Sequence, residues 1–102
     1  MLFQLMMERL ETIAEELENR LIHSKIAGKT ITLKIKYSDF TQQTRSKTVD
    51  TYLYKKEEFF PIIKDLLMQE RLKNSVRLLG ISLSNLNTEK KEPVWVQLRF
   101  EF

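Results

Sequence analysis

Apolar and polar residues repeat along this chain with two different periods. From Leu2 to about His23 the apolar side chains recur every three or four residues, which predicts an amphipathic helix. From Thr30 to Tyr37, in TITLKIKY, they recur every second residue, which predicts a strand with one buried side and one side of threonine and lysine. Gly28 lies between the two segments and indicates a loop or a helix end.

The segment from Thr44 to Tyr54 also has the composition of a strand, but its buried side is ambiguous. Arg45 and Lys47 share a parity with Leu53, so the apolar side stays open, and a bulge is one interpretation. The intervening SDFTQQ has the length of a hairpin connection.

Three further elements follow along the chain. Glu57 to about Asn74 has the apolar spacing of a helix, and Pro61 requires this helix to start shortly before it, because proline is tolerated only near the first turn. Val76 to Leu86 predicts a third strand with Gly80 in its middle, where a glycine often marks a bulge or a close backbone approach. Val94 to Phe102 ends the chain with strict alternation.

The order of these elements predicts an α+β fold with a mostly antiparallel sheet and two helices packed on one face. The 102 residues suffice for one domain. We interpret residues 1–93 as this domain and residues 94–102 as a C-terminal tail.

Charge is distributed unevenly over these elements. The formal net charge of +3 decides little by itself. Between Lys29 and Val49, however, five basic residues stand against Asp39 alone, whereas the first helix carries five glutamates against two arginines. We therefore expect a bipolar domain with basic strands and an acidic helix.

Several classes of site lack the residues that they need. The chain has no cysteine, a single histidine (His23) and two glycines, which argues against disulfides, thiolate zinc sites and phosphate-binding glycine loops. No carboxylate pair has a plausible third metal ligand, and no nucleophile–base pair can be assembled. We predict no catalytic residue, metal or cofactor in this chain, no membrane partner and a cytoplasmic location.

The outward faces of the strands carry a mixture of side chains that suits phosphate groups. Its members are hydroxyl and basic residues: Thr30, Thr32, Lys34, Lys36, Ser38, Thr44, Arg45, Ser46, Lys47, Thr48, Ser82 and Ser84. We identify no outward aromatic among them, so base stacking is not indicated, and no helix offers base-edge readout. Sequence-independent binding of a duplex backbone is one interpretation; the other is that threonine and lysine simply solubilise exposed strands.

Two stretches bring in a family resemblance. IAGKTITLKIKYSDFTQQTRSKTV (Ile26 to Val49) and VRLLGISLSNL (Val76 to Leu86) resemble the little finger domain of Y-family DNA polymerases, specifically the bacterial DNA polymerase IV type, and the resemblance covers essentially the whole chain. It implies an α+β domain at the C-terminus of a lesion-bypass polymerase, which holds primer–template duplex through phosphate contacts of its sheet.

The resemblance also implies which residues contact DNA. By position these are Thr44, Arg45, Ser46, Lys47, Thr48, Arg77 and Ser82. With Thr32, Lys34 and Lys36 from the outward strand face, they make up the predicted DNA-binding residues. Some relatives have a basic residue in place of Leu78 and an arginine in place of Ser82, which weakens the contact region of the third strand here. The carboxylates that hold magnesium for nucleotide addition lie in the palm of the parent polymerase, so this fragment is expected not to be an enzyme.

The family domain opens with a strand before its first helix, whereas this chain starts directly in the helix, so we expect a little finger fold that lacks its first strand. The free sheet edge could then be filled by the tail or by a second copy, in a dimer.

The tail sequence QLRFEF resembles the peptide with which DNA polymerase IV binds the sliding clamp. In that interpretation Leu98, Phe100 and Phe102 are apolar anchors, and Gln97 donates or accepts hydrogen bonds at the entrance of the cleft. The alternative is a final strand that packs its even-numbered face on the domain, and both can hold. An alternative function follows: a protein-interaction module that mainly binds the clamp, with an incidental basic sheet.

Overall fold

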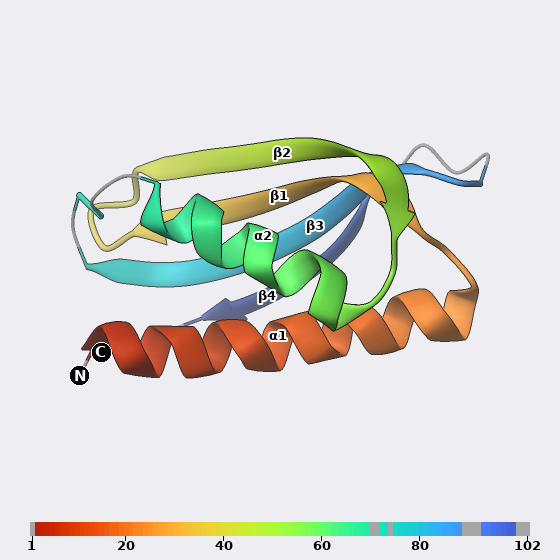
Figure 1. Ribbon diagram of the computed structural model, residues 1–102. Helices are drawn as coiled ribbons and strands as arrows, with labels where there is room; N and C mark the ends of the chain where they lie inside the picture. Colours follow the sequence, from red (N-terminus) through yellow and green to blue (C-terminus); the bar gives the residue numbers. More distant parts are fainter. Residues whose placement is uncertain (1, 70–71, 74, 89–92, 100–102) are drawn as a thin grey trace.

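The structure is a computed structural model, and it describes residues 2–69, 72–73, 75–88 and 93–99. Within these residues the elements are α1 (Leu2–Ser24), β1 (Gly28–Tyr37), β2 (Gln42–Leu53), α2 (Lys56–Met68), β3 (Val76–Leu86) and β4 (Val94–Arg99). The strands form one antiparallel sheet in the order β2-β1-β3-β4. Both helices lie on the same face of it, α1 against β3 and β4, and α2 against β1 and β2 (Figure 1). The predicted α+β fold is confirmed.

The core lies between the sheet and the two helices. The alternation in β1 buries Ile31, Leu33 and Ile35, as the sequence predicts. The helices contribute an apolar stripe each: Met6, Leu10, Ile13, Ala14, Leu17 and Leu21 from α1, and Phe59, Ile63, Leu66 and Leu67 from α2. Burial of these side chains is the main source of the stability of the fold.

The pairing between β1 and β2 resolves the ambiguous strand. Thr30 lies opposite Thr48, but Gly28 lies opposite Leu53, so the register shifts and β2 has extra residues between these two pairs. Leu53 packs in the core, whereas Thr44, Ser46 and Thr48 face the other side of the sheet.

The second helix is shorter than predicted, because α2 ends at Met68 and residues 72–73 are not helical. A helix leaves its last carbonyl groups without partners inside the helix. Here the Arg45 Nη1 donates to the carbonyl oxygens of Leu66 and Leu67 at 2.8 and 2.9 Å. A side chain from β2 therefore satisfies groups that a longer helix would have used.

A lysine at the start of α2 attaches this helix to α1. Lys56 Nζ lies 3.1 Å from the carboxylate of Glu11 and 2.8 Å from that of Glu15, and its backbone N–H donates to Glu18 at 2.7 Å. The hydrogen bond that Lys56 donates to Glu15, supported by the one to Glu11, raises the pKa of Lys56 above its ordinary value. The acidic face of α1 thus positions the start of α2.

Candidate nucleic-acid interface

The sheet face opposite the helices is bare within the described residues, and we call it the helix-free face. Cross-strand partners point to the same side of a sheet, so the register identifies its members. They form rows across the strands: Thr48, Thr30 and Ser84; Ser46, Thr32, Ser82 and Trp95; Thr44, Lys34, Gly80 and Gln97; and Gln42, Lys36 and Leu78. The face therefore combines hydroxyl groups with two lysines.

These polar side chains are available to a ligand to different degrees. Thr44, Ser46 and Thr48 are exposed on the edge strand β2, while Lys34 and Lys36 are half-buried on β1. Lysine and small hydroxyl side chains are common partners of phosphate oxygens. The chemistry of this face therefore suits the binding of anions across its strands.

Arg45 does not belong to this face, which corrects the prediction of an outward phosphate contact. It lies opposite Leu33 on the helix side and is only 6% exposed. Besides the two carbonyls of α2, its guanidinium donates to Gln43 Oε1 at 3.2 Å, and its Nε has no partner in the described part of the chain. A positive charge at a helix C-terminus is favourable, so burial here has a physical reason. In the sequence, Arg45 lies an even number of residues before the apolar Leu53, and this spacing was the signal that it faces the helix side.

Two other predicted contact residues also have different surroundings. Lys47 is exposed, but it lies opposite Ile31, so it projects on the helix side of the outermost strand rather than on the helix-free face. Ser82 faces the expected side of the sheet, but it is only 2% exposed and is therefore too buried for a direct contact with a phosphate. Arg77 is exposed at the start of β3, where the register shifts.

The expectation that no aromatic residue faces outward is wrong. Trp95 lies opposite Ser82 on the helix-free face, and Lys34 Nζ lies 5.7 Å from the centre of its ring. Phe40, in the turn after β1, is 65% exposed. The alternation in VWVQLRFEF buries the even positions, as with Val96, and so already implied that Trp95 faces the other way.

Comparison with known proteins identifies the family. The family model described as "impB/mucB/samB family C-terminal domain" matches residues 3–99. The chain belongs to this family. This confirms the resemblance to the little finger domain of the DNA polymerase IV type.

Similar proteins support the same assignment. The chain is 40% identical over 95 residues to "DNA polymerase IV" from Akkermansia muciniphila, covering 92% of this chain and 26% of that protein. It is 44% identical over 93 residues to the protein of that name from Bacteroides fragilis, with 88% and 26% covered. For the Clostridium perfringens protein the identity is 42% over 101 residues, with 94% and 27% covered. The chain thus spans about a quarter of the length of these relatives, at 26%, 26% and 27%.

In this member of the impB/mucB/samB family, much of the predicted tail is a strand. Residues 94–99 form β4, and Gly80 lies opposite Gln97 while Leu79 lies opposite Leu98. The Gln97 side chain is exposed, and Val96 packs in the core. Phe100 and Phe102, the other two predicted clamp anchors, lie outside the described residues.

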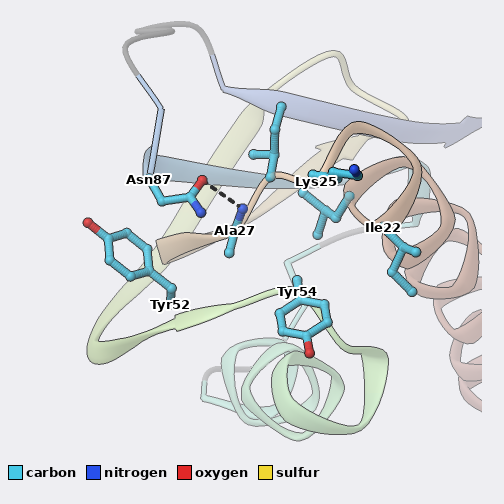
Figure 2. Close-up of a pocket in the computed structure, with 8 residues that line it drawn as sticks. Ile22, Lys25, Ala27, Tyr52, Tyr54 and Asn87 are labelled. Atoms are coloured by element: carbon cyan, nitrogen blue, oxygen red, sulfur yellow. Dashed lines mark hydrogen bonds between the residues drawn. The ribbon is translucent and has the colours of Figure 1, made fainter.

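A cavity of about 430 Å³ lies at the end of the domain where α1 ends (Figure 2). Its lining is mostly apolar: Leu21, Ile22, Lys25, Ile26, Ala27, Tyr52, Tyr54 and Asn87. The Asn87 Oδ1 accepts a hydrogen bond from the backbone N–H of Ala27 at 3.1 Å, which fixes one wall. These lining residues include no carboxylate or histidine.

The described residues contain no group of three or more histidine, cysteine, aspartate or glutamate side chains that could hold a metal ion. Neither described helix has the length and apolar composition that a bilayer crossing requires.

Proposed function

We propose that this domain holds duplex DNA by contacts to phosphates, without reading base sequence, as one part of a longer protein of the DNA polymerase IV type. The observation that carries the proposal is the helix-free face, on which Lys34 and Lys36 lie among hydroxyl side chains. The names of the relatives support DNA as the ligand. Phosphates repeat regardless of sequence, so such a face binds different duplexes alike.

The proposed contact residues differ from those expected from the sequence. They are Thr32, Lys34, Lys36, Thr44, Ser46, Thr48 and Arg77. Arg45 and Ser82 are omitted because they are buried, and Lys47 because it projects on the helix side.

The affinity for two unrelated blunt duplexes, measured by fluorescence anisotropy, tests this proposal. Lys34→Ala with Lys36→Ala should weaken binding to both duplexes by a similar factor, about tenfold or more, because each cation interacts with a phosphate. Lys34→Ala alone should also weaken binding, and Lys47→Ala is its matched control, since it removes one positive charge from the neighbouring strand but from its helix side. An equal loss for Lys47→Ala, or a strong preference of the wild type for one duplex, would contradict the proposal.

The clamp-binding tail is a second proposed function, and it is supported by the QLRFEF pattern and by the exposed side chain of Gln97. Binding in a cleft by all anchors requires residues 97–99 to leave their pairing with β3. The sheet would then keep β1, β2 and β3, so the two ligands need not exclude each other.

Deletion of residues 100–102 tests the tail and leaves β4 intact. It should abolish binding to a bacterial sliding clamp, because two of the three apolar anchors are removed, while duplex binding remains unchanged. Surface plasmon resonance with immobilised clamp measures the first effect, and anisotropy measures the second. Clamp binding that survives the deletion of residues 97–102 would refute the assignment. Clamp binding without any duplex binding would instead favour an interaction module with an incidental basic sheet.

A further inference from the structure

An aromatic side chain projects at the tip of the hairpin between β1 and β2. Phe40 is 65% exposed, although a phenyl ring is normally buried in a domain of this size. The tip lies at the same end of the sheet as the start of β3 (Figure 1). It therefore adjoins the helix-free face, on which Lys36 is the last lysine of β1.

Two cations from different strands flank this ring. The Arg77 guanidinium carbon lies 4.6 Å from the centre of the ring, and Lys36 Nζ lies 5.9 Å from it. Both distances are within the range of cation–π attraction. An exposed aromatic face with cations beside it is the combination that binds single-stranded nucleic acid, because the ring stacks on a base and the cations contact the phosphates.

The backbone of Phe40 has an unfavourable conformation. Phe40 has φ of 69°, a left-handed value that is uncommon for a bulky residue and easier for asparagine or glycine. Hydrogen bonds fix the turn: the Phe40 N–H donates to the Tyr37 carbonyl at 3.0 Å, and Thr41 donates to Asp39 Oδ1 from its N–H at 3.0 Å. Burial of the ring does not offset this strain, because Phe40 is exposed, and a binding role would account for it.

We propose that Phe40, with Lys36 and Arg77, forms a stacking site for an unpaired nucleotide next to a duplex. The position of the duplex rests on the proposed function, because Lys36 belongs both to this site and to the helix-free face. The unpaired base stacks on the ring, and the adjacent phosphates contact the two cations. The domain then prefers a junction between double and single strands to a blunt duplex.

Three DNA ligands test this site by anisotropy with the 102-residue chain: a blunt duplex, the same duplex with a short 5′ or 3′ overhang, and the overhang built from abasic nucleotides. Wild type should bind one of the base-containing overhangs about tenfold more tightly than the blunt duplex. The abasic overhang should give little of this gain, because it keeps the phosphates and removes the bases.

Substitutions of Phe40 distinguish a role in base stacking from a role in stabilising the fold. Phe40→Asn should abolish the gain while the domain melts at the same or a higher temperature, because asparagine tolerates the left-handed backbone. Phe40→Tyr should keep the gain, and Phe40→Leu should lose it. Tyr52→Ala is the matched control at the other end of β2, where an exposed tyrosine lies 4.7 Å from Lys29 Nζ, and it should leave the gain unchanged.

The outcomes distinguish this inference from the proposed function. The stacking site is overturned if the wild type binds the overhang duplex no more tightly than the blunt duplex, or if Phe40→Asn keeps the tighter binding. Either result favours a ring that only positions the two cations or contacts a protein. Blunt-duplex binding that depends on Lys34 would still stand in that case. Overhang binding that requires Phe40, without any binding of blunt duplex, would uphold the stacking site and refute the duplex face.

Discussion

Arg45 and Lys34 are both basic residues on adjacent strands, yet their surroundings give them opposite roles. Lys34 projects from the helix-free face next to Trp95. Arg45 turns to the helix side and donates to carbonyls at the end of α2. A planar guanidinium can donate two or more hydrogen bonds in a fixed geometry, which a lysine ammonium cannot reproduce. The side of the sheet therefore decides whether a cation is available to a ligand or stabilises the fold.

We expect Arg45→Ala to destabilise the domain by about 3 kcal/mol, because two buried carbonyl groups lose a charged donor. Arg45→Lys should have an intermediate effect. Lys47→Ala, two residues along the same strand but exposed, should change the free energy of unfolding by less than about 0.5 kcal/mol. Urea denaturation measures all three. Equal effects of Arg45→Ala and Lys47→Ala would contradict the buried role of Arg45.

At the scale of elements, β2 has hydroxyl residues on the helix-free face and Arg45 on the helix side, and its register shifts near its end. Before the shift the hydroxyl residues point to the helix-free face, and after it Leu53 packs in the core. The shift coincides with Gly28 at the start of β1, where the chain passes close to β3. An ideal Cβ on Gly28 would lie 2.6 Å from the Ser84 carbonyl oxygen, which is closer than real contacts allow. Strand pairing at this end therefore requires a glycine.

Gly28→Ala should destabilise the domain by about 1–3 kcal/mol, since backbone atoms of β3 must move to make room. Gly80→Ala is the matched control: its Cβ would meet the flexible Gln97 side chain at 3.2 Å, so the change should stay within about 0.5 kcal/mol. Thermal denaturation followed by circular dichroism compares the two. A larger loss for Gly80→Ala would show that the close approach at Gly28 is relieved by movement.

The whole molecule separates its charges between its two sides. Glutamates of α1 lie on the helix side, where Glu11 and Glu15 pair with Lys56, whereas Lys34 and Lys36 lie on the helix-free face. A polyanion that approaches the bare side meets cations, and the glutamates are shielded from it by the protein and by salt. The net charge of +3 understates this asymmetry.

The salt dependence of duplex binding reports this arrangement. If Lys34, Lys36 and Arg77 each neutralise one phosphate, the logarithm of the binding constant should fall with the logarithm of salt concentration with a slope of about −3. Combined Lys34→Ala and Lys36→Ala should reduce this slope by about 2, and Lys47→Ala should leave it nearly unchanged. A slope near zero for the wild type would exclude binding by charge. Titrations of one duplex at several salt concentrations provide the slopes.

Local patterns were sufficient to predict most of the fold. The period of the apolar residues identified both helices and the strands, because burial of one side is imposed by helix and strand geometry itself. Alternation also established that Thr32, Lys34 and Lys36 share a face, since these residues lie on one regular strand. The family followed from the motifs of β1, β2 and β3 and was confirmed by comparison.

Tertiary structure decided which side of β2 faces the helices, where α2 ends and which aromatic residues stand beside the cations. Each of these depends on contacts between segments far apart along the chain. Arg45 is buried because the end of α2 offers carbonyl groups to it. The parity that it shares with Leu53 indicates the side of the strand but does not identify these partners. Likewise, Phe40 and Arg77 become neighbours only when β1 pairs with β3. Side-chain periodicity is a property of a strand, whereas the partner of a charge is a property of the folded chain.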